Sequence, residues 1–414
     1  MDIKAIGASA KAASRKIGIA ENSLRNKALE AIASALLERA QEIYAANEKD
    51  IEAAKANGMS PSMLDRLRLT EGRVADMAKG ARELLEIADP LDKVYDESVR
   101  PNGLKIRKKA VPLGVIAIIY EARPNVTVDA AVLCLKSGNA VILKGGKEAI
   151  NSNLCLGGIM RDALESVGLP ADCVTVLSDT SRQAATDLMT LNGYVDVLIP
   201  RGGKGLISAC VQNATVPTIE TGTGNCHIFV DSSADTEMAV NIIFNAKTSR
   251  PSVCNACETV LVHSDIAESF LPKMKAKLDE KSVSLKGDER VIAILGDCVE
   301  KATEADWAEE FLDYTLAVGV VESIDAALAH IAKYSSGHSE AIVTGDEVNA
   351  ERFLREVDAA AVYVNASTRF TDGGEFGYGA EIGISTQKLH ARGPMGVDCL
   401  TTYKYVIEGN GQIR

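Results

Sequence analysis

The stretch from Arg250 to His263 contains a cysteine in a position suited to covalent chemistry. Cys254 lies between a helix-like run and Glu258–His263, whose alternating pattern is typical of a strand, so a short loop carries the thiol. A cysteine is partly ionised at neutral pH, and nearby cations or backbone N–H groups raise the thiolate fraction. Arg250 is such a cation, four residues earlier. The pattern predicts a nucleophile, and the alternative is a small buried hydrophobe, the usual role of a free cysteine.

Length and charge limit the classes of function. With 414 residues, of which 46% are hydrophobic and 25% charged, the chain is long enough for about two or three globular domains. The formal net charge of −12 argues against a surface for nucleic acid or for an anionic membrane, because both need a basic face. An anionic substrate would need basic residues gathered locally.

The cysteines and the N-terminus indicate a reducing compartment. The nine cysteines lie mostly in apolar runs without the paired spacing of zinc sites, and Cys254-x-x-Cys257 lacks a second pair, so we expect reduced thiols and no metal. The first residues, Met-Asp-Ile-Lys, lack an apolar signal core, and no stretch of about 18 uncharged apolar residues occurs. We therefore expect a cytoplasmic protein that is neither exported nor membrane-spanning.

The N-terminal quarter is predicted to be mainly helical. Apolar residues at steps of three and four predict amphipathic helices over Ile3–Asn57 and a further helix over Thr70–Ala88, which stops before Asp89-Pro90. The polar segment Ser98–Lys109 contains Asn102-Gly103, a strong tight-turn signal, and is predicted to form a hairpin.

Short apolar runs then alternate with helical segments up to residue 200. The runs are Val115–Tyr120, Ala140–Lys144, Cys173–Leu177 and Val195–Pro200, and the helical segments are Val128–Lys136, Asn151–Val167 and Ser181–Leu191. This alternation predicts a parallel sheet covered on both faces, the doubly wound architecture of nucleotide-binding domains.

Two glycine-rich loops follow strands of this sheet, although no Gly-x-Gly-x-x-Gly follows its first strand. They are Lys144-Gly-Gly-Lys147 and Arg201-Gly-Gly-Lys204, and we place them at the carboxyl ends of adjacent strands. Glycines let a backbone approach a phosphate, and lysines supply positive charge. A plain turn with a solvated lysine is the alternative for either loop, and the presence of two favours a phosphate-binding edge.

A second alternation begins after Asn225 and predicts a second α/β domain that contains Cys254. Its strands are His227–Val230, Glu258–His263, Leu316–Val321, Ala341–Thr344 and Ala361–Asn365, and its helices are Thr236–Lys247, Ile266–Asp279, Ile324–Tyr334 and Val348–Val357. A last strand, Leu400–Val406, has no local partner. We expect it to pair with the Ser98–Lys109 arm or with another subunit.

Five motifs in this order resemble the aldehyde dehydrogenase superfamily, and the resemblance covers essentially the whole chain. They are Ile119–Asp129, Leu135–Ala140, Arg250–His263, Val321–Ile342 and Glu381–Gly396. The resemblance implies a Rossmann-like parallel-sheet cofactor domain, a second α/β catalytic domain and a small oligomerisation arm. The expected boundaries are residues 1–98 and 110–225 for the NADP-binding domain, 226–366 for the catalytic domain with Cys254, and 99–109 and 367–414 for the oligomerisation arm and C-terminal strand segment.

The resemblance also implies catalytic roles. Cys254 matches the superfamily's nucleophile. Asn125 is similar to the asparagine whose amide, with the Cys254 N–H, holds the developing oxyanion, and a plain Pro-Asn turn is the alternative. Glu220, two residues before Gly222, is similar to the glutamate that activates water in hydrolytic members. It could instead be a strand-end carboxylate bound to backbone or to the substrate amine.

Cofactor and substrate residues follow from the same resemblance. The cofactor-binding residues would be Lys144, Gly145, Gly146, Lys147, Arg201, Gly202, Gly203 and Glu310. Lys144 would hold the adenosine ribose, Lys147 the 2′-phosphate that distinguishes NADP, and Glu310 the nicotinamide ribose. A solvated lysine and a solvated acidic run are the alternatives for Lys147 and Glu310. The substrate's carboxylate and phosphate would be held by Arg123, Arg250 and Arg392, unless these form surface salt bridges.

The branch of the superfamily that the chain resembles reduces L-glutamyl 5-phosphate with NADPH to glutamate 5-semialdehyde, the second step of proline biosynthesis. The resemblance implies a thioester on Cys254, a homo-oligomer, and glutamate 5-kinase as a partner that supplies the substrate. Two alternatives are a hydrolytic aldehyde dehydrogenase and a non-catalytic oligomeric scaffold. Quenching of the single tryptophan, Trp307, during NADPH titration would count against the scaffold.

Overall fold

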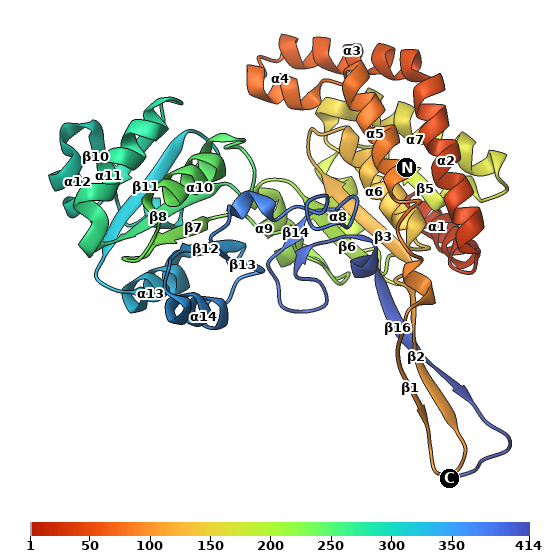
Figure 1. The fold of residues 1–414 in the computed structure, drawn as a ribbon. Helices are drawn as coiled ribbons and strands as arrows, with labels where there is room; N and C mark the ends of the chain where they lie inside the picture. Colours follow the sequence, from red (N-terminus) through yellow and green to blue (C-terminus); the bar gives the residue numbers. More distant parts are fainter. Residues whose placement is uncertain (1) are drawn as a thin grey trace. The chain divides into compact units, whose positions relative to one another are not determined.

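The chain folds into two compact units (Figure 1). The computed structural model describes residues 2–414, with Ser62 described by its backbone alone. Unit 1 comprises Met1–Thr221, Gly377–Gly383 and Met395–Arg414, and unit 2 comprises Gly222–Phe376 and Ile384–Pro394. The chain therefore passes between the units at 221/222, 376/377, 383/384 and 394/395.

Unit 1 begins with the helices that the apolar spacing predicts. Its α-helices are α1 (Ile3–Ile17), α2 (Asn22–Glu38), α3 (Ala40–Ala56), α4 (Pro61–Leu67), α5 (Glu71–Glu83), α6 (Asn125–Lys136), α7 (Ile150–Ser166), α8 (Arg182–Met189) and α9 (Lys204–Asn213). Its 3-10 helices are η1 (Pro90–Asp92), η2 (Lys147–Ala149), η3 (Ala171–Cys173) and η7 (Val397–Leu400). Helix α5 ends five residues before the predicted Ala88, because the chain leaves it through three-residue turns such as Leu85 N–H to Arg82 C=O at 2.9 Å.

The first sheet is parallel, as predicted. It consists of β3 (Val115–Tyr120), β4 (Ala140–Lys144), β5 (Val174–Val176) and β6 (Val197–Arg201), in the order β5-β4-β3-β6. Every residue of β3 and β4 is buried, since helices cover both faces. The prediction that the two glycine-rich loops follow adjacent strands is wrong, because β3 lies between β4 and β6. The run Val115–Tyr120 was predicted as a strand, but a continuous apolar run gives no information on the order of strands in a sheet.

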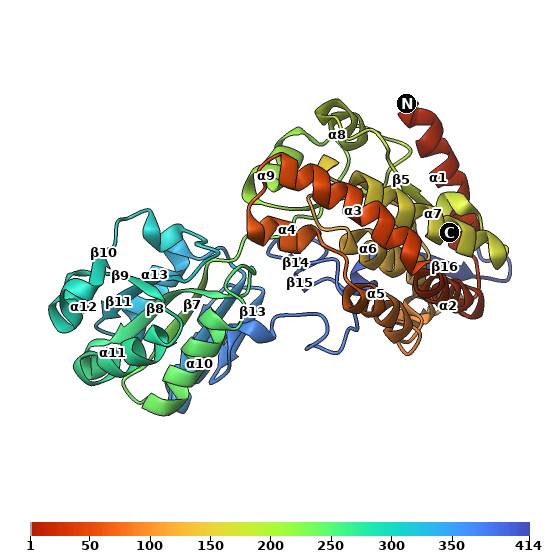
Figure 2. The ribbon, with the colours of Figure 1, turned by 90° about the horizontal axis from the view of Figure 1, so that it is seen from above.

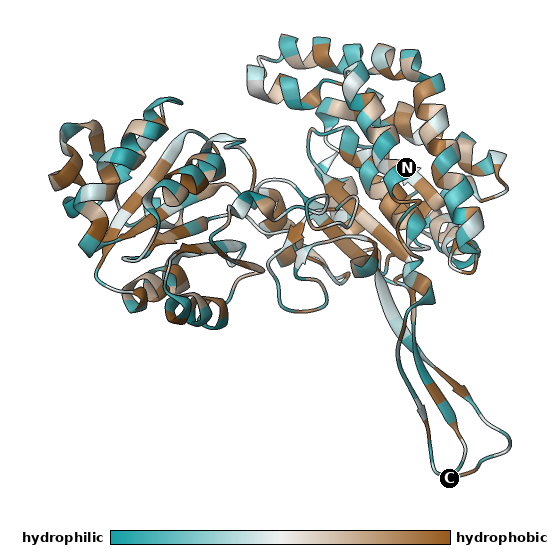
Figure 3. Ribbon diagram, in the orientation of Figure 1, coloured by the Kyte–Doolittle hydropathy of each residue, from teal (hydrophilic) through white to brown (hydrophobic). Residues whose placement is uncertain are grey.

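The arm of unit 1 is a three-stranded antiparallel sheet. It consists of β1 (Val94–Val99), β2 (Lys105–Pro112) and β16 (Thr401–Glu408), with β2 in the centre. The last strand thus pairs with the predicted hairpin of its own chain. Along β16 the side chains of Tyr403, Tyr405 and Ile407 are exposed. Figure 3 shows apolar and polar residues interleaved along this arm, whereas the strands of the two parallel sheets are mainly apolar.

Unit 2 is built on a seven-stranded parallel sheet. Its strands are β7 (Cys226–Val230), β8 (Cys257–His263), β9 (Ser284–Gly287), β10 (Val299–Lys301), β11 (Thr315–Val321), β12 (Ser339–Val343) and β13 (Ala361–Val364), in the order β10-β9-β11-β8-β7-β12-β13. Its helices are α10 (Thr236–Thr248), α11 (Ser264–Asp279), α12 (Glu289–Leu295), α13 (Ile324–Tyr334) and α14 (Glu347–Glu356), with η4 (Gly296–Cys298), η5 (Asp306–Ala308) and η6 (Thr368–Phe370). A two-stranded ladder pairs β14 (Ile384–Ser385) with β15 (Gly393–Pro394).

Alternate residues of β8, the strand after Cys254, pack into two separate core clusters of unit 2, as the predicted alternation requires. Val260 and Val262 pack into a cluster with α10 and α11, and Leu261 packs into the opposite cluster with α13 and α14. Figure 1 shows α10 and α11 on one side of the sheet and α13 and α14 on the other, and Figure 2 views the sheet from the side of α10 and α11. Strands β9 and β10 and helix α12 were not predicted, because elements of three to seven residues carry too little periodicity.

No helix between residues 2 and 414 is long and apolar enough to cross a membrane.

Candidate active site

Cys254 lies in the loop between α10 and β8, as predicted, and its side chain is half-buried. Two neighbours fix its backbone. The Cys226 thiol donates to the Cys254 carbonyl at 3.2 Å, and a Cβ on Gly224 would lie 1.4 Å from the same oxygen. Only glycine therefore fits at Gly224, and the loop that carries the thiol is packed tightly against the start of β7. The assignment of Cys254 as nucleophile stays a prediction.

Cys257 differs from Cys254 in its surroundings. It opens β8, is fully buried, and its thiol donates to the Thr259 carbonyl at 3.4 Å. Burial raises the pKa of Cys257, so this thiol stays protonated at neutral pH. All nine cysteines are free thiols. Among the residues that the structure describes, no group of His, Cys, Asp or Glu could hold a metal ion.

The segment that precedes β7 is held by Glu310 and by Asn225. The Gly224 N–H donates to Glu310 Oε1 at 2.7 Å. The Asn225 amide donates to the carbonyls of Trp307 and Tyr334 at 2.7 and 2.9 Å. Glu310 thus contacts the backbone that packs against Cys254. The expected contact of Glu310 with a nicotinamide ribose stays a prediction.

A buried ion pair lies beside the segment that carries Glu310. Lys247 Nζ lies 2.5 Å from Glu258 Oε2, and both side chains are fully buried. Removal from water raises the pKa of Glu258 to about 7, while Lys247 lowers it. Glu258 Oε1 also accepts from the Leu312 N–H at 3.3 Å and so holds the segment that carries Glu310. Sequence reasoning missed this pair, although a glutamate at the start of an otherwise apolar strand was a usable signal.

In unit 1, Asn125 begins α6 and its side-chain amide is oriented by a carboxylate one turn later. Asn125 Nδ2 donates to Asp129 Oδ2 at 2.9 Å. Removal from water raises the pKa of Asp129 to about 6, although the Asn125 hydrogen bond and the nearby Arg201 lower it. Arg123 is exposed in the loop before α6. Asp129 was not singled out from the sequence, although its i+4 spacing from Asn125 on one helix was visible.

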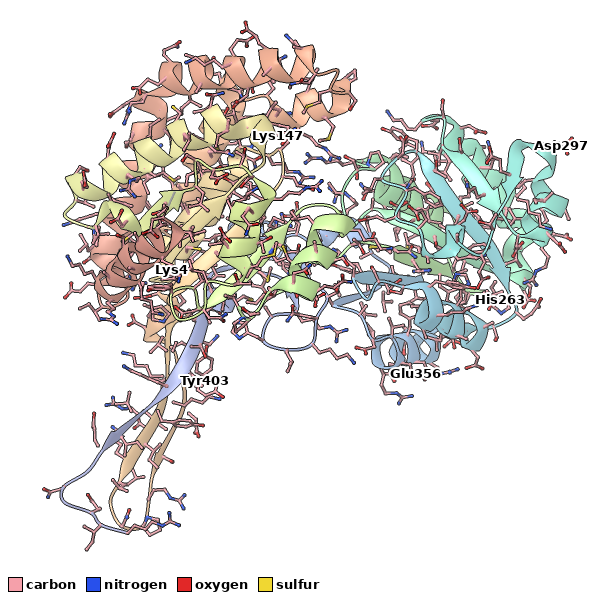
Figure 4. The ribbon with its side chains drawn as sticks, turned by 180° about the vertical axis from the view of Figure 1, so that it is seen from behind. Lys4, Lys147, His263, Asp297, Glu356 and Tyr403 are labelled. Atoms are coloured by element: carbon pink, nitrogen blue, oxygen red, sulfur yellow. The ribbon has the colours of Figure 1, made fainter. Side chains whose placement is uncertain are left out.

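The first glycine-rich loop follows β4. Lys144 is buried, its Nζ donates to the Thr180 carbonyl at 3.1 Å, and burial lowers its pKa. A Cβ on Gly145 would lie 2.2 Å from Asn153 Nδ2, and one on Gly146 would lie 2.6 Å from Glu148 Oε2. The loop therefore excludes side chains at both glycines. Lys147 opens η2 and is exposed (Figure 4).

The second glycine-rich loop follows β6, and the carboxylate of Glu121 binds to its backbone. The Gly203 N–H donates to Glu121 Oε2 at 2.9 Å, and a Cβ on Gly202 would lie 2.7 Å from the same carboxylate. Glu121 thus occupies the position at the start of α9 that a phosphate would take. Arg201, the last residue of β6, is half-buried, and its guanidinium packs against Gly383.

Two further candidates lie outside these loops. Glu220 is half-buried at the end of the first block of unit 1. Arg392 Nη2 forms an ion pair with Asp358 at 2.8 Å, and Lys388 pairs with the same carboxylate. The salt bridge named as the alternative role of Arg392 is therefore present. Unit 2 contains Cys254, Arg250 and Glu310. Unit 1 contains Asn125, Glu220 and both glycine-rich loops.

Comparisons with known proteins agree over almost the whole chain. The model of the aldehyde dehydrogenase family matches residues 1–303. The gamma-glutamyl phosphate reductase of Clostridium perfringens (strain SM101 / Type A) is 58% identical over 408 residues, 99% of this chain and 98% of the relative. The enzyme of the same name from Caldanaerobacter subterraneus is 56% identical over 414 residues, the full length of both. The crystal structure of gamma-glutamyl phosphate reductase from Thermotoga maritima superposes with a TM-score of 0.96, at 48% identity and 99% coverage of each chain.

Proposed function

Because the chain belongs to the gamma-glutamyl phosphate reductases of the aldehyde dehydrogenase family, and is therefore an oxidoreductase, we propose that it reduces L-glutamyl 5-phosphate to glutamate 5-semialdehyde. Phosphate is the second product, NADPH is the reductant, and the reaction is the second step of proline biosynthesis. The observation that carries the proposal is the Cys254 loop, whose backbone is fixed by Cys226 and Gly224 while the thiol stays half-buried.

The proposed reaction begins with attack of the Cys254 thiolate on the acyl carbon. A C–S bond forms, the C–O bond to phosphate breaks, and phosphate leaves with the electron pair. The resulting thioester would accept a hydride at its carbonyl carbon, and the C–S bond of the thiohemiacetal oxyanion would then break to give the aldehyde and the Cys254 thiolate. The Asn125 amide and the Cys254 N–H would hold the oxyanion in both halves, because each half develops negative charge on the same oxygen.

The residues of the β4 loop fit an NADP cofactor. Asn153 and Glu148 fill the space that a Cβ would take at Gly145 and Gly146, so the support for a cofactor here comes from the two lysines that flank these glycines. Lys144 would hold the adenosine ribose, and the exposed Lys147 would pair with the 2′-phosphate. When bound, NADPH supplies the hydride.

The forward reaction tests this function directly. NADPH absorbance should fall only when glutamate 5-kinase, glutamate and ATP generate the acyl phosphate in the same solution. One phosphate should be released from the acyl phosphate for each NADPH consumed. Glutamate with ATP but without the kinase is the control and should leave NADPH unchanged. Absence of NADPH oxidation in the complete mixture would exclude the proposed substrate.

Cofactor preference should depend on Lys147. We expect a clear preference for NADPH over NADH, which shrinks in Lys147→Glu mainly through a higher KM for NADPH. A charge-assisted bond to the 2′-phosphate, worth about 1.5 to 3 kcal/mol, becomes a repulsion. NADPH titration followed by Trp307 fluorescence should show the weaker binding, while NADH binding is little changed. Equal kcat/KM for the two cofactors in the unsubstituted enzyme would show that Lys147 takes no part.

A further inference from the structure

Arg369 is a cation held against the cysteine loop of unit 2. Its Nε donates to Ser249 Oγ at 3.0 Å, and its Nη1 donates to Asn255 Oδ1. Asn255 is the residue immediately after Cys254, and Ser249 is the residue before Arg250. The guanidinium therefore bridges the two ends of the loop that carries the thiol, although Arg369 follows it by more than a hundred residues.

The contact between Arg369 and the loop is reciprocal. Asn255 Nδ2 donates to the carbonyls of Arg369 and Thr371 at 3.2 and 3.0 Å, and Thr368 Oγ1 donates to the Asn255 carbonyl at 2.7 Å. Asn255 and Thr368 are buried. The 3-10 helix η6 and the cysteine loop thus form one hydrogen-bonded piece, in which the guanidinium has a defined place relative to Cys254.

The charge of Arg369 is not matched by a bonded carboxylate. Both side-chain hydrogen bonds that it makes within the described chain go to neutral groups, the Ser249 hydroxyl and the Asn255 amide oxygen. Burial lowers the pKa of Arg369 and Arg250 lowers it further, whereas Asp372 and Cys254 raise it. Asp372 offsets part of this charge, and a bound anion would further stabilise the half-buried guanidinium of Arg369 beside the exposed one of Arg250.

We propose that Arg369, together with Arg250, forms the site for the phosphoryl group of the substrate and for inorganic phosphate in the reverse reaction. This inference rests on the proposed function. In L-glutamyl 5-phosphate the phosphoryl group is joined through one oxygen to the carbon that Cys254 attacks. The α-carboxylate is separated from that carbon by three further carbons, so cations beside Cys254 face the phosphate.

The site would act on the leaving group. In the forward direction the bond between the acyl carbon and the phosphate oxygen breaks, and the departing oxygen gains negative charge. A guanidinium fork can hold two phosphate oxygens at once and stabilise this charge. In the reverse direction a phosphate oxygen attacks the thioester carbon, the C–O bond forms, and the Cys254 thiolate leaves with the electron pair of the C–S bond.

The substitution Arg369→Lys tests the proposal in the reverse reaction, with glutamate 5-semialdehyde, NADP and inorganic phosphate. A lysine keeps the charge but cannot form the fork. We expect the KM for phosphate to rise about tenfold to a hundredfold. The KM for the aldehyde and the amplitude of the NADPH burst formed without phosphate should change far less than the KM for phosphate, because both precede phosphate entry. The control is Arg352→Lys, a surface arginine of α14 paired with Asp325 and Glu356, which should change neither quantity.

A role for Arg369 limited to supporting the loop predicts a different result. In that case the burst would shrink in Arg369→Lys in parallel with phosphate-dependent turnover, and that outcome would overturn the proposal. Turnover of the unsubstituted enzyme without phosphate would instead refute the proposed function. The two failures are therefore distinguishable.

A second measurement does not depend on turnover. Iodoacetamide alkylation of Cys254, followed by mass spectrometry of the peptide that contains it, should be slowed by inorganic phosphate in the unsubstituted protein. Arg369→Lys and Arg250→Lys should each weaken this protection by about tenfold or more in phosphate concentration. Equal protection in the unsubstituted protein and in Arg369→Lys would place phosphate elsewhere and reject the site.

Discussion

Replacement of Cys254 by alanine should abolish turnover and leave NADPH binding and the melting temperature nearly unchanged. In the proposed reaction the thiol forms the covalent bond to the acyl group, so its loss would remove the reaction path and not a binding contact. Its side chain is half-buried in a loop, so truncation removes little packing. The measurements are kcat/KM in the forward reaction, NADPH titration by Trp307 fluorescence and thermal unfolding.

The matched control is Cys257→Ala, three residues along the same stretch. Cys257 is fully buried at the start of β8, so this change should cost roughly 1 kcal/mol of unfolding free energy and little activity. If Cys254→Ala kept more than about a hundredth of the original kcat/KM, the loss would be below roughly 3 kcal/mol and covalent catalysis by Cys254 would be wrong.

With glutamate 5-semialdehyde and NADP, the enzyme should form NADPH in a single burst without phosphate and continuously with phosphate. In the proposed reaction the acyl group on Cys254 leaves only when phosphate attacks it, because a reductase must keep its thioester from water. Hydrolysis would return glutamate and waste the phosphorylation. The burst amplitude should equal the concentration of active sites, and stopped-flow absorbance of NADPH measures both phases.

Glu220 decides how this experiment is interpreted. A carboxylate in this sequence context activates water in hydrolytic relatives, according to the resemblance, and Glu220→Gln removes such a base. We expect the phosphate-dependent rate of Glu220→Gln to persist if Glu220 is structural. Steady NADPH production in phosphate-free buffer that disappears in Glu220→Gln would replace the reductase assignment with the hydrolytic alternative.

The local sequence was sufficient to predict an element wherever its residues are uniformly buried or its apolar residues recur at a regular spacing. The predicted bounds of β3, β4 and α13 agree with the structure residue for residue. Central parallel strands are buried on both faces and so appear as continuous apolar runs, and α13 presents an apolar side at the helical period. These patterns predicted the parallel α/β class, the two alternating segments and the loop position of Cys254. The family resemblance followed from the five longer motifs.

Only the tertiary structure showed which distant groups hold the loops of the candidate site. Arg369 and Asn255 are 114 residues apart, Glu310 and Gly224 are 86 apart, and Glu121 and Gly203 are 82 apart. The order of strands, with β3 between the two glycine-rich loops, was also decided there. Periodicity and propensity act over one turn or one strand, whereas these contacts depend on which strand ends meet at one edge of a sheet. The sequence determined the class of fold and the position of Cys254 in a loop, and the folded chain determined which distant residues contact that loop.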